Sequence, residues 1–421
     1  MLNPQPIADC PPMTPKTFLP YGRQWVDESD IQAVAEVLRS EFLTCGPRVE
    51  EFEDRFASLV GARHAVAMNS ATSALHVAML VTGIRRGDRV ITTPNTFLAS
   101  ANCAAFVGAT PDFADIDPVS YNLDAAALAR TWRSDTKAVI AVDYAGQPCD
   151  MPRIARFVRE RGAVVIEDAC HGLGGRMVHN GRVWNLGGHP WADITVFSFH
   201  PVKTMTSGEG GMFVTDNDAW AESARRLRSH GVVRAPACFV GLCSEPDSQG
   251  GSQLAERGPW YYEMQDLGYN YRITDIQCAL ALSQLTRLND FIVRRRETVA
   301  RYNAAFSDLL WLTTPALRDP ANRDCISWHL YTVQIAFENI GKTRTQVMTE
   351  LRQKGIGTQV LYIPVHLQPW YRKHYGYGPG KCPVAEECYR HTLSLPLYPA
   401  MMDADVDRVI GSVRDLSGKR I

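Results

Sequence analysis

The stretch ITVFSFHPVKTMTSGEGG, residues 194–211, combines an apolar run with a loop that carries a lysine. Residues 194–199 are mostly β-branched or aromatic and predict a buried strand. Lys203 follows in a loop of Gly, Ser and Thr residues, an unusual place for a solvated charge. Burial lowers the pKa of a lysine and makes its amine nucleophilic. A surface lysine is the ordinary interpretation of one isolated position, but the particular pattern around Lys203 favours a reactive amine.

Other strand-like runs flank this stretch and alternate with helical patterns. Apolar runs predict strands at residues 64–68, 89–93, 137–144, 163–168 and 211–216. Helical spacing of apolar residues predicts helices at 71–81 and 95–109. Strands and helices in this alternation indicate an α/β fold, with a mostly parallel sheet covered on both faces.

The chain divides into four segments. Residues 1–20 are rich in proline and polar groups and predict a loose N-terminal arm, and residues 21–282 predict a large domain. The helical pattern over 283–307 predicts a connecting helix. Residues 308–421 predict a smaller α+β C-terminal domain.

Two stretches need separate comment. Within the small domain, apolar runs predict strands at 329–337 and 358–364, with a helix at 344–355 between them. Residues 235–260 are rich in Gly, Pro and Ser and predict a long loop. Loops of that length tend to be functional or disordered.

Composition narrows the class of protein. The 421 residues carry a formal net charge of −1 with no long run of one sign, which argues against a nucleic-acid surface or a polybasic membrane tether. Eleven cysteines without a CxxC pair fit free thiols in a reducing compartment. The first 16 residues contain no apolar h-region, so we expect no signal peptide, and no segment reaches the roughly 18 apolar residues that a membrane span needs. We expect a cytoplasmic protein without a metal site that binds neither nucleic acid nor membrane.

A candidate phosphate site lies at residues 69–73, where Asn-Ser-Ala-Thr-Ser opens the helix predicted at 71–81. Helix N-termini offer free N–H groups and a positive dipole to anions. An ordinary helix cap uses the same residue types, and the motif alone favours that simpler interpretation.

A candidate carboxylate site follows the strand at 163–168, where Asp168 precedes Ala, Cys and His171. Ligands of open α/β sheets bind at the carboxyl ends of strands. A carboxylate there can pair with the ring nitrogen of pyridoxal 5′-phosphate (PLP), but a loop aspartate that caps the next turn is equally compatible. His171 is by default a structural histidine, although it lies within reach of the same ligand.

Together these motifs resemble the DegT/DnrJ/EryC1/StrS sugar aminotransferases, and the resemblance spans residues 19–399. It rests on four stretches of this sequence: Ser198-Phe199-His200-Pro201-Val202-Lys203 with Gly208-Glu209-Gly210-Gly211; Asn69-Ser70-Ala71-Thr72-Ser73-Ala74-Leu75; Glu167-Asp168-Ala169-Cys170-His171-Gly172; and Gly268-Tyr269-Asn270-Tyr271-Arg272-Ile273-Thr274-Asp275-Ile276-Gln277.

The resemblance implies the fold and the cofactor. It implies a PLP-dependent fold type I aminotransferase, whose large domain has a mostly parallel seven-stranded sheet between helices. Lys203 would hold PLP as a Schiff base and later move protons between substrate and cofactor. The other implied cofactor contacts are Asp168 on the pyridinium nitrogen, His171 near the phenolic oxygen, Phe97 stacked on the ring, Ala71, Thr72 and Ser198 on the phosphate, and Asn270 on the phosphate from a partner subunit. A homodimer with shared active sites is therefore implied.

Further stretches resemble one branch of this family, the UDP-4-amino-4,6-dideoxy-N-acetyl-β-L-altrosamine transaminases of pseudaminic acid synthesis. They are residues 143–146, 229–231, 258–265 and 362–369. The branch implies transfer of an amino group from L-glutamate to C4 of a UDP-linked 4-keto-6-deoxy-N-acetylhexosamine. The residues expected to bind substrate are Thr44, Arg234, His329, Tyr331 and His366.

Alternatives stay open for several of these positions. Arg234 fits an anion site or a surface salt bridge, and Trp328 and His329 fit a nucleotide site or core packing. Another nucleotide-linked 4-keto sugar, such as the precursor of UDP-4-amino-4-deoxy-L-arabinose, is an alternative substrate. A PLP-dependent sugar dehydratase is disfavoured, because such members of the family carry histidine where this chain has Lys203.

Overall fold

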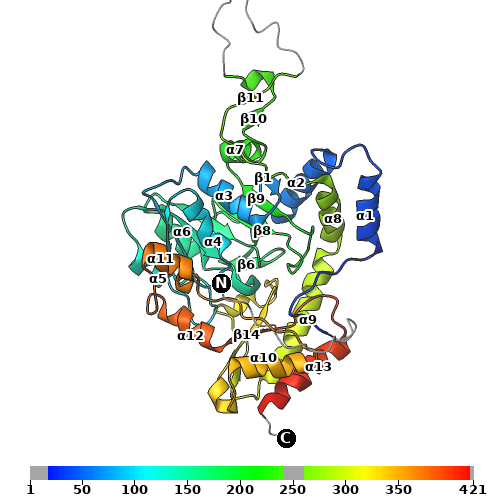
Figure 1. The fold of residues 1–421 in the computed structure, drawn as a ribbon, viewed down its shortest axis with the longest axis vertical. Helices are drawn as coiled ribbons and strands as arrows, with labels where there is room; N and C mark the ends of the chain where they lie inside the picture. The colour runs from blue at the N-terminus through cyan, green and yellow to red at the C-terminus, as the bar shows by residue number, and fades with distance from the viewer. Residues whose placement is uncertain (1–17, 241–259, 418–421) are drawn as a thin grey trace, which may run out of the picture.

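A seven-stranded sheet forms the centre of the large domain (Figure 1). The computed structural model describes residues 18–240 and 260–417. The strands lie in the order β1 (His64–Met68), β9 (Gly211–Thr215), β8 (Ile194–Ser198), β5 (Val164–Asp168), β4 (Thr136–Val142), β2 (Arg89–Thr92) and β3 (Thr110–Phe113). β9 runs antiparallel to both of its neighbours, and the other pairings are parallel. The predicted mostly parallel seven-stranded sheet is confirmed.

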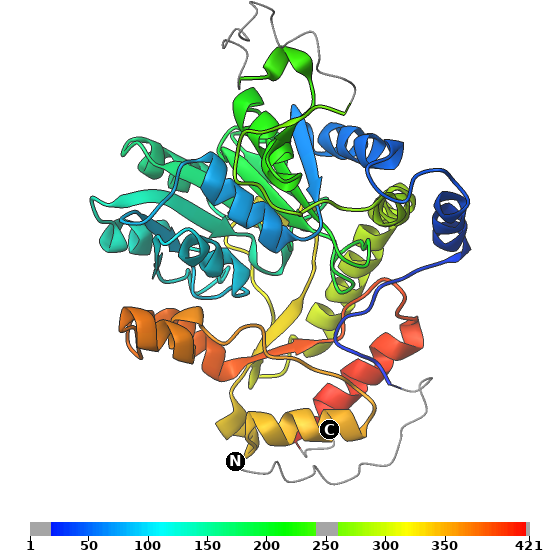
Figure 2. The same cartoon turned by 45° about the horizontal axis from the view of Figure 1, so that its top comes forward.

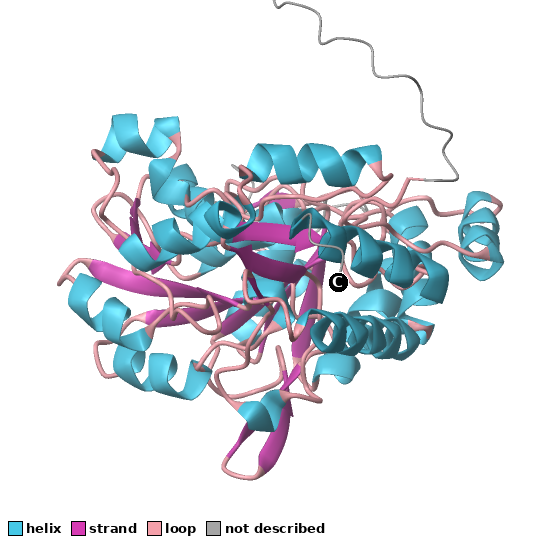
Figure 3. Cartoon of the chain, turned by 90° about the horizontal axis from the view of Figure 1, so that it is seen from below, coloured by secondary structure: helices cyan, strands magenta, loops and turns pink. Residues whose placement is uncertain are grey.

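Helices cover both faces of the sheet, as Figure 3 shows from below. α3 (Ala71–Val81), α4 (Ala99–Phe106) and α7 (Asp218–Arg228) share an apolar core with β1, β4, β5 and β8. α2 (Pro47–Val60) and α8 (Asp275–Thr286) pack with the opposite side chains of β1, β8 and β9. α5 (Ala125–Thr131) and α6 (Met151–Arg159) cover β2, β4 and β5. Because both faces are buried, the strands are apolar nearly throughout.

The local predictions agree closely with these elements. The helix expected at 71–81 is α3, which begins after Ser70, whose side chain accepts the Ser73 N–H. The helix expected at 95–109 is shorter, because the residues before Ala99 form the loop after β2. β3 was not predicted: its sequence TPDF contains a proline, which a strand tolerates at a sheet edge.

The small domain is built on a three-stranded antiparallel sheet. Its strands are β12 (Leu312–Thr313), β13 (Tyr331–Ile335) and β14 (Thr392–Leu395), and its helices include α10 (Arg344–Gln353) and α13 (Asp403–Arg414). α9 (Leu288–Phe306) enters it from the large domain, separated from α8 by Arg287. The predicted α+β character is confirmed. Leu19, expected in a loose arm, is buried in this domain and bonded to Gly355 and Gly357; residues 1–17 lie outside the described part.

The strand predicted at 358–364 is wrong. This segment makes a single bridge, Gln359 to Ser394, and then leaves the small sheet. It leaves because its later residues bond to the large domain: the Tyr144 hydroxyl donates to the Leu361 carbonyl at 2.5 Å, and the Val365 N–H donates to the Pro94 carbonyl at 3.0 Å.

Residues 363–385, which we call the strap, lie against the large domain, although in sequence they belong to the small C-terminal domain. They include α11 (Pro369–Tyr375) and the start of α12 (Pro383–His391), the orange helices under the large domain in Figure 2. The Tyr371 hydroxyl donates to Asn102 Oδ1 at 2.6 Å, and the Tyr377 hydroxyl donates to the Pro111 carbonyl at 2.7 Å.

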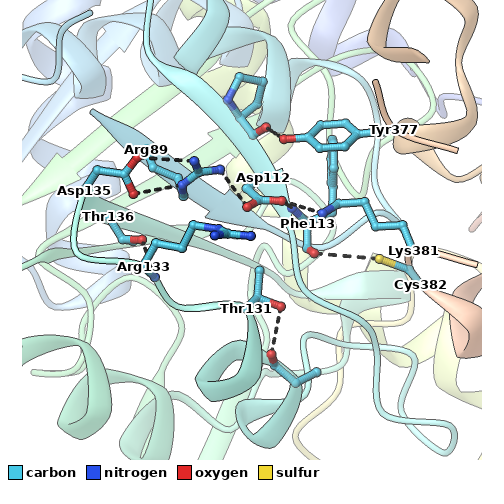
Figure 4. Close-up of polar contacts among 12 residues, drawn as sticks. Arg89, Asp112, Phe113, Thr131, Arg133, Asp135, Thr136, Tyr377, Lys381 and Cys382 are labelled. Carbon is cyan, nitrogen blue, oxygen red and sulfur yellow. Dashed lines mark hydrogen bonds and ion pairs between the residues drawn. The ribbon is translucent and has the colours of Figure 1, made fainter. Parts of the chain in front are cut away.

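A charged network reinforces the attachment of the strap (Figure 4). Lys381 of the strap lies 2.7 Å from Asp112 of β3, and Arg89 of β2 lies 2.7 Å from the other oxygen of the same carboxylate. Arg89 also bonds to Asp135 at 2.9 Å. Because the Asp112 side chain is 3% exposed, both cations are needed to offset the cost of burying its charge.

A narrow ribbon projects beyond α7 at the top of Figure 1. It consists of β10 (Val232–Val233) paired with β11 (Glu263–Met264). Most of the loop predicted at 235–260 lies outside the described residues. In the part of the chain that is described, no helix has the length and apolar character needed to cross a membrane.

Candidate active site

The candidate site lies where the carboxyl ends of β4, β5 and β8 meet. In the parallel register, Val142 pairs with Asp168, and Asp168 pairs with Val196. Asp143 follows β4 and Ser198 ends β8, so that residues distant in sequence share one edge of the sheet. Ligand sites of open α/β sheets are formed at this edge.

Asp168 is held in one orientation by two donors. Its Oδ2 accepts the Ser100 hydroxyl at 2.6 Å, and its Oδ1 accepts the Cys170 N–H at 3.2 Å. Because Ser100 donates to Asp168, it must accept from the Thr96 hydroxyl, 2.8 Å away. The buried carboxylate retains lone pairs for a cationic partner. Sequence reasoning missed Ser100, although it lies three residues after Phe97 in the same loop-to-helix segment.

Lys203 lies in the loop after β8, partly buried beside Asp168. The backbone N–H of Lys203 donates to the His200 carbonyl at 2.9 Å. Burial lowers the pKa of the Lys203 amine, and the nearby Cys170 and Asp168 oppose that effect. A lysine of this kind can act as a nucleophile and as a proton carrier.

His171 and His329 pack together beside Lys203. Their ring centroids lie 4.4 Å apart, and both side chains are buried. Burial lowers the pKa of His171 well below its ordinary value, and the Lys203 charge adds to the effect. The pKa of His329 is lowered by burial and then by His171 and Lys203. The structure therefore brings two of the predicted residues, from different domains, to the same place.

The backbone at Ala145 holds the His171 ring and the main chain of His329. The Ala145 N–H donates to His171 Nδ1 at 3.3 Å, and its carbonyl accepts the backbone N–H of His329 at 2.9 Å. Ala145 has φ 58°, a left-handed conformation that is unfavourable for alanine. At the adjacent Gly146, a side chain would meet the Ser327 carbonyl at 2.0 Å, so glycine is required there.

The phosphate site predicted at residues 69–73 corresponds to the first turn of α3. The N–H groups of Ala71 and Thr72 have no acceptor within the helix, because they belong to its first turn. Gly211, at the start of β9, approaches this turn closely: a Cβ there would lie 2.4 Å from the Ala71 nitrogen. Ser198, at the end of the neighbouring strand β8, pairs with Gly211 in the sheet.

Phe97 is 58% exposed, although the residues just before it are buried. Its ring lies 6.3 Å from the Tyr362 ring. An aromatic face left open at the edge of a buried site is suited to stacking on a planar ligand. Tyr362 comes from the segment just before the strap. It belongs to the motif at residues 362–369, but the sequence alone did not assign it a role.

Three other predicted residues lie at the surface of this chain. Asn270 is exposed, and its carbonyl is 3.4 Å from Asn69 Nδ2. Thr44 is exposed and bridged to Thr274. Arg234 lies on the projecting ribbon, 5.4 Å from the Tyr262 ring. Within one chain, the structure does not bring Arg234 into contact with the described residues around Lys203.

Tyr331 and His366 lie in the interior rather than on a ligand surface. Tyr331 is completely buried in the small-domain core, where its hydroxyl donates to Asn303 at 2.8 Å. His366, within the strap, is completely buried and bonded to Glu386 at 2.9 Å. Their enclosure argues against the predicted contacts with substrate. Asn303 accepts from the Tyr331 hydroxyl and Glu386 pairs with His366 Nε2, while His366 Nδ1 has no hydrogen-bond partner among the described residues.

The residues at this edge fit PLP. Asp168 offers a fixed carboxylate, the start of α3 offers unpaired N–H groups, Phe97 offers an open aromatic face, and Lys203 offers an amine of lowered pKa. The close approach of Gly211 to α3 leaves the first turn free of side-chain cover on that side. We expect no metal, and the described residues contain no cluster suited to one.

Comparison with known proteins agrees with this chemistry. The pattern of the DegT/DnrJ/EryC1/StrS aminotransferase family matches residues 24–414. The spore coat polysaccharide biosynthesis protein SpsC of Bacillus subtilis is 41% identical over 400 residues, covering 95% of this chain and 97% of SpsC. The structure of Helicobacter pylori PseC, an aminotransferase of pseudoaminic acid biosynthesis, superposes with a TM-score of 0.83 at 29% identity, covering 95% of this chain and 99% of PseC.

A further structure bears on the cofactor. The PLP form of the putative sugar aminotransferase Spr1654 of Streptococcus pneumoniae superposes with a TM-score of 0.82 at 27% identity, covering 95% of this chain and 99% of that one. Fold and site thus define a PLP-dependent fold type I aminotransferase that acts on nucleotide sugars. The chain belongs to the DegT/DnrJ/EryC1/StrS aminotransferase family.

Gly211→Ala is expected to weaken PLP binding and to lower stability by about 1–3 kcal/mol, because the added methyl group would collide with the backbone of α3. Fluorescence titration with PLP and thermal denaturation measure the two effects. Gly411→Ala in α13 is the control: nothing lies within 4 Å of its Cβ position, and it should stabilise by about 0.5–1 kcal/mol. Equal behaviour of the two variants would contradict the assignment of this close contact.

Proposed function

We propose that the chain transfers an amino group from L-glutamate to C4 of a UDP-linked 4-keto-6-deoxy-N-acetylhexosamine, the reaction of a UDP-4-amino-4,6-dideoxy-N-acetyl-β-L-altrosamine transaminase. The observation that carries the reaction is the placement of Lys203, an amine of lowered pKa, beside the fixed carboxylate of Asp168. This pair is what transamination requires of the protein.

The residues around Lys203 would hold the cofactor from several sides. Asp168 would pair with its ring nitrogen, and Phe97 would stack on its ring. Ala71, Thr72 and Ser198 would bind its phosphate, with Asn270 reaching the phosphate of the other subunit. When bound, PLP supplies an electron sink for bond breaking at the substrate carbon.

Lys203 would carry the proton in both halves of the reaction. In the first half, the neutral amine would accept the proton from the α-carbon of glutamate and pass it to the cofactor; in the second half it would take a proton back from the cofactor and deliver it to C4 of the sugar. Burial favours the neutral form, because it lowers the pKa of this amine. Alternating use of one site by the two substrates predicts ping-pong kinetics.

The sugar is supported by likeness to PseC and by the motif at residues 362–369. A second candidate is another nucleotide-linked 4-keto sugar that serves a surface polysaccharide, which the 41% identity to SpsC favours. Of the predicted substrate residues, Thr44, Arg234 and His329 remain in this proposal. Thr44 and Arg234 are exposed, so that they would act near a subunit boundary.

A homodimer with shared active sites is part of the proposal. Large apolar side chains are exposed on and after α1 (Glu28–Leu38): Ile31 by 54%, Leu38 by 58% and Phe42 by 49%. Exposed apolar groups gathered in this way are typical of a protein–protein interface. A partner subunit that covers α1 would give these side chains an apolar environment.

Addition of PLP to the native protein should give a visible absorption band that L-glutamate removes. Lys203→Ala should lose the glutamate response and at least about a thousandfold in turnover, because no other group carries the proton. Lys137→Ala, which changes an exposed lysine of β4, should behave as the native protein. A native protein that forms no band with PLP would contradict the proposed function.

The sugar preference is tested with a panel of nucleotide-linked 4-keto sugars and mass spectrometry of the aminated products. We expect kcat/KM for the UDP-linked 4-keto-6-deoxy-N-acetylhexosamine to exceed that for a UDP-linked 4-keto-pentose by at least about tenfold, or ~1.4 kcal/mol. The reverse order would favour the alternative substrate while leaving the reaction class intact.

Subunit sharing is tested by mixing two inactive variants. Lys203→Ala removes the amine, and Asn270→Asp places a negative charge against the phosphate of the partner. Refolded mixtures should recover up to about a quarter of native activity, because half of the dimers are mixed and each has one intact site. No recovery, or sedimentation of the native protein as a single 46.8 kDa chain, would exclude shared sites.

A further inference from the structure

Tyr362 forms a hydrogen bond with His171 at the candidate active site. Its hydroxyl oxygen lies 3.1 Å from His171 Nε2, and the two rings are nearly parallel at 17°. Tyr362 lies within the small domain in sequence, but the strap after it is fixed to the large domain by Val365, Tyr371 and Lys381. The Tyr362 hydroxyl is therefore held in the same frame as the residues that end the central strands.

The protonation state of His171 follows from its other nitrogen. The Ala145 N–H points at His171 Nδ1 at 3.3 Å, and a nitrogen that accepts this hydrogen bond cannot itself carry a proton. The imidazole is thus neutral with its hydrogen on Nε2, in agreement with the lowered pKa. The other charged or titratable groups that influence this ring or pack on it, Lys203 and His329, do not favour a second proton.

The direction of the Tyr362 bond then follows. His171 Nε2–H donates, and the Tyr362 oxygen accepts. The hydrogen of the Tyr362 hydroxyl must therefore point elsewhere, and among residues 18–240 and 260–417 the structure gives it no acceptor. Tyr362 is also close enough to Asp168 and Cys170 for their charges to act on it, and its ring lies 6.3 Å from the open face of Phe97.

We propose that Tyr362 is a fixed hydrogen-bond donor to an oxygen atom of the bound ligands, and that His171 is the positioning residue that orients it. This inference rests on the proposed function. The acceptor is an oxygen that carries full or partial negative charge, which either the phenolate of the cofactor or the carbonyl group of the keto substrate supplies. A preset donor aimed at such an oxygen is worth most in a site shielded from water.

The alternative is that the Tyr362–His171 bond only holds the two domains together, and the variants distinguish this role from a contact with the ligands. The strap has its own attachments at Tyr371 and Lys381, so that loss of the Tyr362 hydroxyl should not free it. Tyr371→Phe is the matched control: it also removes one hydroxyl with a single partner, Asn102 at 2.6 Å. This control changes the strap without changing the residues around Lys203.

Tyr362→Phe tests the proposal with two measurements. If the acceptor is the cofactor phenolate, the variant should show a pH midpoint of the visible band, measured without substrate, about one unit higher than the native protein. Without the Tyr362 donor the phenolate oxygen keeps more negative charge, and the proton next to it is held more tightly. If the acceptor is the keto group, the midpoint should stay, and the single-turnover rate with keto-sugar should fall about tenfold to a hundredfold while the rate with glutamate is unchanged. Either result supports the proposal, and Tyr371→Phe should show neither.

Two results would overturn it. One is a Tyr362→Phe protein with the native midpoint and both native rates. The other needs neither the variant nor the cofactor: nitrogen NMR of cofactor-free native protein should find His171 protonated on Nε2, and a proton on Nδ1 would end the argument. A native protein that forms no visible band with PLP would remove the proposed function as well, so the two failures are distinguishable.

Discussion

Parallel pairing of β4, β5 and β8 is the constraint on which the site depends. Because these strands point the same way, Asp143, Asp168 and Ser198 emerge at one edge of the sheet. β9 then reverses direction and begins with Gly211 against the first turn of α3. The loop that makes this reversal carries Lys203, so that the amine, the carboxylate and the phosphate-binding turn are gathered by the order of the strands alone.

Sequence signals predicted those parts of the fold that are determined locally. α3 was predicted at its observed bounds, because apolar periodicity and the capping Ser70 act within one helix. The strands at the carboxyl edge were predicted within about two residues, since burial on both faces makes them apolar throughout. β3 could not be found in this way: Pro111 and Asp112 argue against a strand, and only the edge position and the cations around Asp112 explain it.

Side-chain destinations depend on contacts that no local pattern contains. His329 and Tyr331 are two residues apart, yet His329 packs on His171 and Tyr331 faces Asn303 in the small-domain core. In a continuous strand over 329–337 two such residues would share one face. β13 begins only at Tyr331, so the His329 side chain is directed by the preceding loop instead. Tyr362 was likewise hidden, because its position follows from the attachment of the strap, whose partners Asn102, Pro111 and Asp112 are more than 250 residues away in the sequence.

The strap also decides where this protein can be cut and recombined. Chimeras that exchange C-terminal domains between relatives usually join at the linker, here near the end of α9. Such a joint would replace Tyr362 and place a foreign strap on a surface shaped for this one, and Asp112 would lose its partner Lys381. Exchange of the small domain without damage to catalysis therefore requires two joints, one before residue 360 and one after residue 385, that leave the intervening chain with the large domain.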